Sequence, residues 1–446
     1  MIKHRESYLK TAVSMAVLAT TGAAAITYLF FDLRRSLNGG AAYSILLSAI
    51  ILLLLCFEFG VVLVLTGSLV VLRRDRLEAL GFPYAGGPRE WHGGALVRLL
   101  RGVLRKVRAL GVIRPGQLDL RAGETVVIRS REEIVATLDG RGELESLPFM
   151  PEMESLCGRE ARVHRRVDKI FDWITSSGLR RMRDTVILDG LRCDGGSHDA
   201  CQADCPILWK EAWLRRASDV AEAQFKEPAD TSAGLDLRQF TTRIDEETGE
   251  TRFVCQLCRL PQATTPTPWS SPRNLLRELF SGNVRIAPFI AFIAIFAFNA
   301  VQRRVKGACF PLLGHSNLQK TPHGVLNIQP GELVRIKTKH EIEQTLNSQF
   351  KNRGLWFDKE MTRFCGGTYK VRARVDRQID ERTGKMVIIN TPCITLEGVT
   401  ATGEYFEFAP LDERIYWREI WLERIEGAKV PASEPPDLSR VEAKVQ

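Results

Sequence analysis

The hexapeptide Trp209-Lys-Glu-Ala-Trp-Leu214 recurs as Trp417-Arg-Glu-Ile-Trp-Leu422, 208 positions further along the chain. The same spacing relates Gly123-Glu124 to Gly331-Glu332. Matches in one register over a domain-sized stretch indicate that one structural module occurs twice. Other pairs at this spacing are Ile128 with Ile336, Glu133-Ile134 with Glu341-Ile342, Phe149 with Phe357, Cys157-Gly158 with Cys365-Gly366, Arg166-Val167-Asp168 with Arg374-Val375-Asp376, and Gly190 with Gly398. We call residues 120–226 module 1 and residues 331–427 module 2.

The pattern within each module predicts an α+β fold. Val126–Ile128 and Val334–Ile336 alternate as short strands. Short helices are expected over 131–138 and 339–346, and residues 369–390 predict a β-hairpin that turns at Gly384.

The last element of each module is predicted to be a helix. Pro206 and Pro410 suit its first turn, and Trp209 and Trp213 would then lie on one face, four residues apart. Core positions are expected for these tryptophans and for Trp417 and Trp421, and a binding surface is the alternative. We predict two small, β-rich modules of SH3-like barrel type, each closed by a helix.

The recurring residues resemble those of an uncharacterised bacterial membrane-protein family. Its members share Cys-Gly, then Arg-Val, then a terminal Trp-x-Glu-x-Trp-Leu, here Cys365-Gly366, Arg374-Val375 and 417–422. The resemblance covers most of residues 120–425, and it implies no activity.

Two apolar stretches near the N-terminus, Thr11–Phe31 and Ala42–Val71, are each long enough to cross a bilayer. They predict a transmembrane hairpin within residues 1–76. Lys and Arg are more frequent outside the hairpin than in its loop, which favours cytoplasmic ends. The expected location is the bacterial inner membrane, multi-pass, with cytoplasmic modules. A cleaved signal peptide is the alternative interpretation of the first stretch.

Two further segments are expected to contact lipid. Residues 77–119 are basic, and apolar residues at helical spacing within 96–110 suit either an anionic membrane surface or packing on the modules. Ile286–Val301 is apolar but short for a span, so an interfacial, a re-entrant, a buried and a spanning helix all remain open. The net charge of +9 favours anionic lipid head groups or another anionic partner.

The segment 227–330 connects the modules. It is expected to contain a hairpin over 237–256, a linker rich in Pro and Thr over 261–272, and a short helix over 275–280 before the apolar stretch. The tail, residues 428–446, is polar and is predicted to be disordered.

The main chemical signal is a cluster with the spacing C-x4-H-x2-C-x3-C, formed by Cys193, His198, Cys201 and Cys205. Three thiolates and one imidazole suit tetrahedral zinc better than an iron–sulfur cluster. The positions 208 further on are Ala401, Phe406, Ala409 and Glu413, so the module fold does not need these ligands. A metal staple, a functional site and unliganded thiols all remain open, as do disulfides if the modules lie outside the cytoplasm.

Other cysteines carry weaker signals. Cys205 comes directly before the expected helix start at Pro206, where free N–H groups would favour a thiolate. Cys255 and Cys258 have the C-x2-C spacing of a metal half-site or a redox pair. Cys157 and Cys365 occur in both modules beside glycine, and we expect buried structural thiols there.

The function is predicted to be that of a membrane-tethered scaffold or binding protein with a zinc site and a protein or anionic partner. The carboxylates that recur in both modules are expected to maintain the fold, because a catalytic site is needed only once. The sequence has no P-loop, Rossmann, nucleophile-elbow or zincin motif. The alternatives are a metal- or thiol-dependent enzyme centred on Cys193–Cys205 and, third, a nucleic-acid-binding membrane protein.

Overall fold

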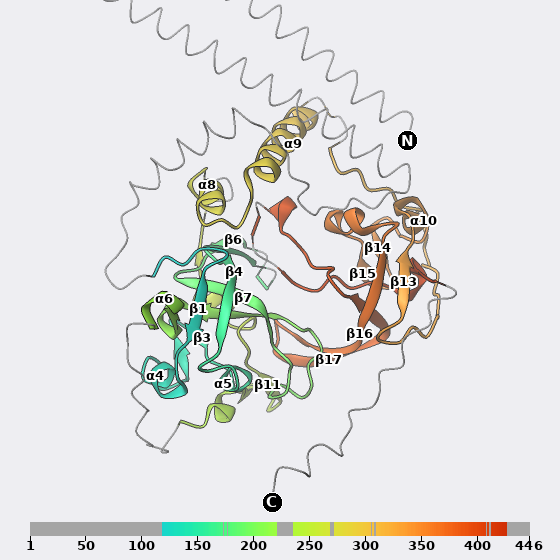
Figure 1. Ribbon diagram of the computed structural model, residues 1–446. Helices are drawn as coiled ribbons and strands as arrows, with labels where there is room; N and C mark the ends of the chain where they lie inside the picture. The colour runs from blue at the N-terminus through green and yellow to red at the C-terminus, as the bar shows by residue number, and fades with distance from the viewer. Residues whose placement is uncertain are drawn as a thin grey trace, which may run out of the picture.

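The computed structural model describes residues 118–425, except 173, 176, 221–234, 268–271, 305, 307–308, 407 and 410–411. The predicted transmembrane hairpin, almost all of the basic segment 77–119 and the polar tail lie outside the described residues. Among the residues that are described, the fold is mixed α/β, with antiparallel half-barrel sheets and few helices (Figure 1).

Module 1 is built on a five-stranded sheet with the order β8-β7-β4-β1-β9. Strand β4 mixes buried and exposed residues, whereas β8 is buried throughout. The strands are β1 (Thr125–Ile128), β4 (Glu160–Arg166), β7 (Thr185–Arg192), β8 (Pro206–Lys210) and β9 (Leu214–Arg216). The remaining elements are α4 (Arg131–Val135), β2 (Glu143–Leu144), β3 (Leu147–Pro148), α5 (Pro151–Glu154), β5 (Lys169–Asp172), β6 (Gly178–Arg181) and α6 (Ala217–Val220).

Module 2 is built on a four-stranded sheet with the order β17-β16-β13-β18. Its two longest strands form one hairpin that reaches across to module 1 (Figure 1). The strands are β13 (Leu333–Ile336), β16 (Thr368–Asp380), β17 (Lys385–Leu396) and β18 (Leu422–Arg424), and the smaller elements are α10 (Lys339–Glu343), β14 (Lys351–Asn352) and β15 (Leu355–Trp356).

Corresponding elements of the two modules begin 208 residues apart. This holds for β1 and β13, for α4 and α10, and for β9 and β18. Both short helices start with a capping box, Ser130 with Glu133 and Thr338 with Glu341. The helices end at 135 and 343, earlier than predicted, while the expected strands and the 369–390 hairpin are present.

The predicted closing helix is wrong in both modules. Residues 206–210 form the buried strand β8, and a single 3-10 turn, Glu211–Trp213, leads into β9. In module 2 the equivalent turn is Glu419–Trp421. The run Ile-Leu-Trp pairs with β7 because both of its faces are buried, and this burial outweighs the i,i+4 spacing of the tryptophans.

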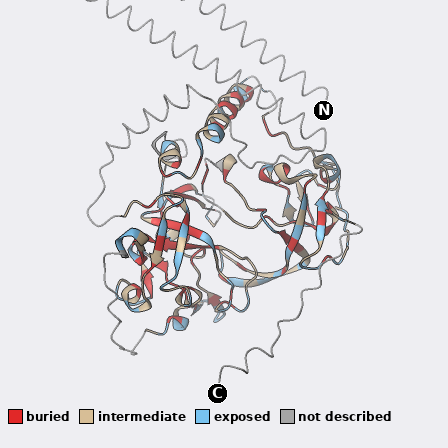
Figure 2. Ribbon diagram, viewed as in Figure 1, coloured by how far each residue is buried: buried red, intermediate tan, exposed pale blue. Residues whose placement is uncertain are grey.

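The four tryptophans are core residues, as predicted. Trp209, Trp213, Trp417 and Trp421 are fully buried. Figure 2 shows buried residues along the strands of both modules. The tryptophan in each 3-10 turn donates its indole N–H to a threonine just after the short helix of its module. Trp213 donates to Thr137 at 3.1 Å, and Trp421 donates to Thr345 at 2.8 Å. The two modules therefore close around the same contact.

An arginine–glutamate ion pair fixes the entry of the chain into each module, and it is fully buried in module 1. In module 1 the Glu211 carboxylate accepts from the backbone N–H groups of residues 118, 119 and 120 at 2.8–3.1 Å and pairs with Arg166, whose side chain is 2% exposed. In module 2 Glu419 accepts from the N–H groups of residues 326–328 and pairs with Arg374, which is 27% exposed.

The connecting segment lies against both modules. The end of α8 (Pro272–Phe280) is fixed to module 1, because the Asn283 side chain exchanges two hydrogen bonds with the Arg166 backbone, each of 2.8 Å. Phe289 and Phe292 of α9 (Ile286–Arg304) contact Phe408 of module 2. The other elements are β10 (Thr242–Ile244), β11 (Thr251–Phe253), α7 (Leu260–Ala263) and β12 (Thr265–Pro266), which pairs with β6.

The modules meet along a seam, which we define as the contacts between the β7–β8 loop (193–205) with its flanking Arg192 and module 2. Asp204 accepts from Arg372 at 2.8 Å and from Arg414 at 2.7 Å. Gln202 exchanges backbone and side-chain hydrogen bonds with residues 376 and 377. Arg192 donates to Asp412 at 2.8 Å. Charged and backbone contacts thus fix one module against the other.

We expect Glu211→Gln to lower the free energy of unfolding by about 3–5 kcal/mol, because it leaves the buried Arg166 without its closest carboxylate. Glu419→Gln should cost less, about 1–3 kcal/mol, because Arg374 keeps more solvent. Chemical denaturation of the full chain, followed by tryptophan fluorescence, measures both. The control is Glu124→Gln, whose partly exposed pair with Arg216 should be worth less than about 1 kcal/mol. A Glu211 variant as stable as this control would contradict the assignment.

Candidate metal centre

The cysteine cluster lies in the loop that joins β7 to β8. Cys193 directly follows β7 and Cys205 directly precedes β8, and the N–H of Cys193 donates to the carbonyl of Cys205 at 2.9 Å. The positive φ of Gly195 lets the loop fold back on itself, and a side chain there would collide with the backbone at Cys201. The loop ends thus bring the first and last cysteines of the cluster side by side.

A group that could hold a metal ion is formed by Glu152, Cys193 and His198, whose ligand atoms lie within 4.8 Å of one another. Glu152 comes from α5, and the other two residues come from the loop. The His198 side chain is 1% exposed. Its Nδ1 is 2.6 Å from the Glu152 carboxylate and its Nε2 is 3.1 Å from the carbonyl of Val254.

The electrostatics of this group are those of a buried ion pair. Burial alone would lower the pKa of His198, but hydrogen bonds with Cys193 and with the Glu152 carboxylate raise it to about 10. Burial would raise the pKa of Glu152, and the bond with His198 holds it below its usual value instead. A protonated imidazole has no lone pair for a metal, so His198 must lose a proton before it can be a ligand.

The equivalent carboxylate in module 2 has a structural role. Glu360 accepts from the N–H groups of Thr402 at 2.6 Å and Tyr405 at 3.4 Å, just as Glu152 accepts from Ser197 at 3.0 Å. The loop that Glu360 anchors, residues 401–413, contains no cysteine or histidine. A buried carboxylate can therefore anchor such a loop without a metal.

The structure brings together part of the predicted ligand set. Cys193 and His198 are in contact, whereas the Cys201 thiol accepts from the N–H of Ile379 in module 2 at 3.4 Å. The prediction of a Cys205 thiolate at a helix start is wrong, because Pro206 begins a strand. Burial, followed by the negative charges of Glu381 and of Cys193, raises the pKa of Cys205 well above its usual value.

The sequence interpretation missed Glu152 as a candidate ligand. The signal that the sequence offered for this residue was its recurrence in module 2 as Glu360.

Cys255 and Cys258 also lie near the cluster. Their Sγ atoms are 3.2 Å apart, and the N–H of Cys258 points at the Cys255 sulfur at 3.5 Å. The hydrogen bond with Cys258, together with burial, raises the pKa of Cys255, and the same bond lowers that of Cys258. Cys255 packs against the same hydrophobic core as Cys193 and Cys205.

Comparisons with protein-family models, with curated proteins and with solved structures found no match. The resemblance to an uncharacterised membrane-protein family therefore stays an expectation. Chemical roles for this chain are therefore inferred from contacts among the residues that the structure describes.

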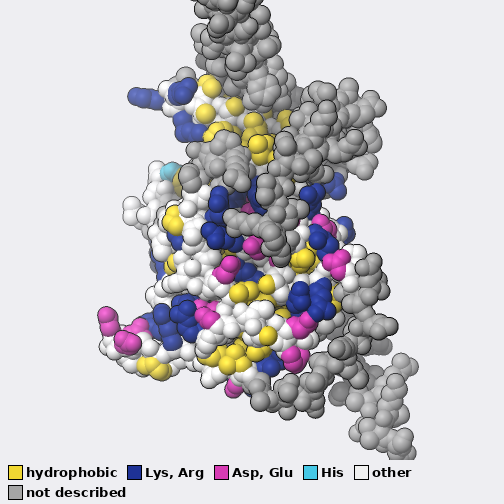
Figure 3. Space-filling view, turned by 90° about the vertical axis from the view of Figure 1, so that its left-hand side faces the viewer, with side chains coloured by type: hydrophobic (Ala, Val, Ile, Leu, Met, Phe, Trp, Pro, Cys, Tyr) yellow, Lys and Arg dark blue, Asp and Glu magenta, His cyan; other side chains and the backbone are white. Residues whose placement is uncertain are grey.

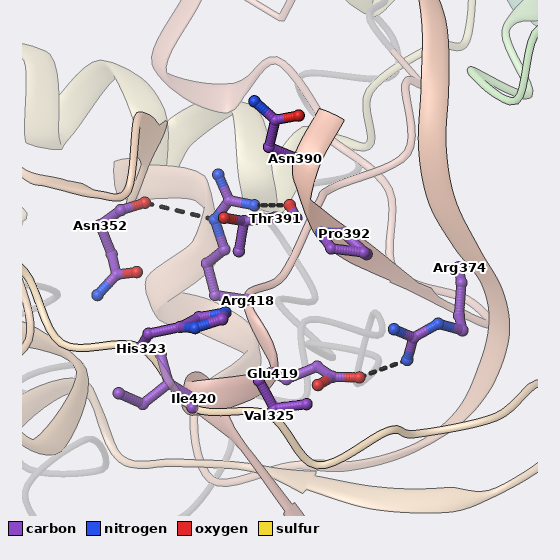
Figure 4. Close-up of a pocket in the computed structure, with 11 residues that line it drawn as sticks. His323, Val325, Asn352, Arg374, Asn390, Thr391, Pro392, Arg418, Glu419 and Ile420 are labelled. Atoms are coloured by element: carbon purple, nitrogen blue, oxygen red, sulfur yellow. Dashed lines mark hydrogen bonds and ion pairs between the residues drawn. The ribbon is translucent and has the colours of Figure 1, made fainter. Parts of the chain in front are cut away.

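A cavity in module 2 offers little room for a small molecule. It holds about 80 Å³ beside Asn352, Arg418 and Glu419 (Figure 4), far below the roughly 300–1,000 Å³ of ligand pockets. Its charged groups are already paired. Arg418 donates to the carbonyls of Asn352, Arg353 and Thr391, and Glu419 pairs with Arg374.

Cys157 and Cys365 are half-buried rather than buried as predicted, and each sulfur lies against a backbone carbonyl. The Cys157 sulfur lies 3.8 Å from the carbonyl of Met153, and Cys365 makes the equivalent contact with Met361 at 3.7 Å. Burial, reinforced by the charges of Glu154 and Glu132, raises the pKa of Cys157 to about 11. Little thiolate is then present near neutral pH.

We expect the alkylation of Cys157 by iodoacetamide in the folded chain to be slower than in the denatured chain by roughly a hundredfold near neutral pH, since thiolate is the reacting species. Peptide-resolved mass spectrometry across a pH series measures this rate. The denatured chain is the matched control. An inflection at or below neutral pH would identify Cys157 as an activated nucleophile and contradict the structural role.

Proposed function

We propose that this chain is a membrane-associated binding protein without a catalytic centre, in which two copies of one SH3-like module form a single platform at the bacterial inner membrane. The observation that carries the proposal is the seam, where Asp204 of module 1 pairs with Arg372 and Arg414 of module 2. Modules joined in this way hold one relative orientation and present a shared surface to a protein or anionic partner.

The carboxylates that recur in both modules support a structural rather than a catalytic role. Glu211 and Glu419 bind backbone amides and arginines, as described above. Asp172 accepts from the N–H groups of residues 174 and 175, each at 2.9 Å, and Asp380 caps the β16–β17 turn by accepting from Arg382 at 3.1 Å. Groups engaged in this way are not free to transfer protons to a substrate.

The basic residues of β16 give no support to nucleic-acid binding. A strand that binds single-stranded nucleic acid needs cations free for phosphates and aromatic rings free for bases. Here Arg372 pairs with Asp204 and Arg374 pairs with Glu419. Their charges are used within the protein.

Association with a bilayer is supported by α9. Among the described residues, it is the one helix long and apolar enough to cross a membrane, and a third of its apolar window is buried in the protein. Phe296 is 46% exposed, and Arg303 and Arg304 end the helix. Figure 3 shows hydrophobic side chains along this helix with Lys and Arg beside them. We propose that α9 contacts lipid and that the arginines contact anionic head groups.

We further propose that the cysteine cluster binds zinc and that the metal is structural. Soft thiolate donors in a reducing compartment suit zinc. The cluster lies at the seam, where Cys201 already contacts module 2, so a bound ion would stiffen the platform. The two pockets described are lined by residues between 319 and 420, and none of the cluster cysteines borders either of them.

We expect Asp204→Ala to loosen the seam, because Arg372 and Arg414 lose a shared carboxylate. The amides of residues 376–379 should exchange with deuterium faster by roughly tenfold to a hundredfold, which corresponds to about 1.5–3 kcal/mol. Hydrogen exchange with mass spectrometry of the full chain measures this.

The matched control for this change is Asp199→Ala in the same loop. Asp199 is 63% exposed and lies 3.9 Å from Arg377, so its loss should leave exchange nearly unchanged. Equal protection of residues 376–379 in the Asp204 variant and the wild-type chain would show that the seam does not hold the modules together, and the platform would be refuted.

We expect a tryptophan placed at position 296 to be quenched by brominated lipid chains when the full chain is reconstituted in bilayers. The control is Ile244→Trp on β10, because Ile244 is 64% exposed and the β10–β11 hairpin lies at the opposite end of the molecule from α9 (Figure 1). Quenching beyond that of the wild-type chain should occur for Phe296→Trp and not for Ile244→Trp. No added quenching at position 296 would place α9 outside the bilayer.

A further inference from the structure

Cys193 and Cys205 face each other across the base of the β7–β8 loop. Arg192 and Pro206 are register partners of the two strands, so the next pair inward is Cys193 with Cys205. Directly opposed residues of an antiparallel pair have Cβ atoms about 5 Å apart on one face. Two sulfurs placed in this way can reach one ion at the zinc–sulfur distance of about 2.3 Å.

Cys255 and Cys258 form a compact turn of the connecting segment. The N–H of Cys258 donates to the Cys255 sulfur, and the two sulfurs are already adjacent. An N–H directed at a sulfur stabilises a thiolate, and a C-x2-C turn with this contact is a common metal half-site.

Gln256, inside this turn, fixes the turn to β8. Its side-chain oxygen accepts from the N–H of Leu208 at 2.8 Å, and its side-chain nitrogen donates to the Leu208 carbonyl at 2.9 Å. Leu208 is three residues after Cys205. From the other side, His198 contacts Cys193 and also donates to the carbonyl of Val254, the residue before Cys255. Two independent contacts therefore bring the turn to the loop base.

Among the described residues, the ligand atoms that already lie within 4.8 Å of one another are those of Glu152, Cys193 and His198, so the four sulfurs would have to converge when an ion binds. Cys193, Cys205 and Cys255 pack against the same hydrophobic core, and Leu257 of the turn is buried in it.

We propose that Cys193, Cys205, Cys255 and Cys258 are the four ligands of one tetrahedral zinc ion, which staples the connecting segment to module 1 next to the seam. This inference rests on the proposal above that the chain binds zinc, and it names the four ligands of that ion. Binding converts each thiol to a thiolate and releases its proton to solvent. His198 and Glu152 are then the ion pair that holds the loop in place, and Cys201 stays on the N–H of Ile379.

Zinc-edge X-ray absorption of the full chain, purified in detergent under reducing conditions, tests the ligands without any substitution. We expect one zinc per chain with four sulfur neighbours at about 2.3 Å. A shell with nitrogen or oxygen at about 2.0–2.1 Å would overturn the four-thiolate assignment and leave the zinc proposal standing, with Glu152, Cys193 and His198 as its ligands. Absence of zinc, or two disulfides in place of four thiols, would overturn both.

Variants give a second measurement. Cys255→Ser and Cys258→Ser should lose most of the zinc, measured by elemental analysis per chain, whereas the matched control Cys201→Ser should retain it. Full zinc content in the Cys255 and Cys258 variants would refute the assignment. If a variant fails to fold, cobalt exchanged into the wild-type chain gives the same answer. The sulfur-to-cobalt charge-transfer absorption should then be that of four thiolates. A spectrum with fewer sulfur ligands would overturn the proposal.

Discussion

A paired arginine and glutamate, buried in module 1 and partly exposed in module 2, determine how each module closes. In module 1, Glu211 satisfies three successive N–H groups where the chain enters and also pairs with Arg166 of β4. One carboxylate thus joins the entry segment, a central strand and the final turn. A buried charge that loses its partner is costly, so this arrangement tolerates few alternatives. The loops of the module are free to differ because the frame does not depend on them.

Much of this frame could be predicted from local pattern. The short strands alternate visibly, and the helices at 131 and 339 have Ser or Thr followed by Glu three residues later, which satisfies the first N–H groups. The final element could not be predicted in this way. Trp209 and Trp213 have helical spacing, yet one lies on a strand and the other in a turn. Burial on both faces of β8 decides its conformation, and that burial depends on neighbours far away in sequence.

The candidate metal centre shows the same limit. Cys193, His198, Cys201 and Cys205 are close in sequence and were identified together, but the loop directs Cys201 toward module 2. Glu152 reaches His198 from a separate helix. The C-x2-C turn is held near the cluster by Gln256 through the backbone of Leu208, a contact that no local spacing encodes. Side-chain chemistry was therefore predictable, whereas the set of residues that meet was not.

The absence of the cysteine cluster from module 2 follows from what lies beside each loop. The loop of module 1 faces the part of the connecting segment that follows β11 and carries the C-x2-C turn, through the contact of His198 with Val254. The equivalent loop of module 2 faces α9, which presents Phe289 and Phe292, and it meets them with the buried Phe408. An apolar neighbour can be held by burial alone. The turn beside module 1 is held by the buried Leu257 and by the Gln256 hydrogen bonds, and a shared metal ion would add a link through its two thiols.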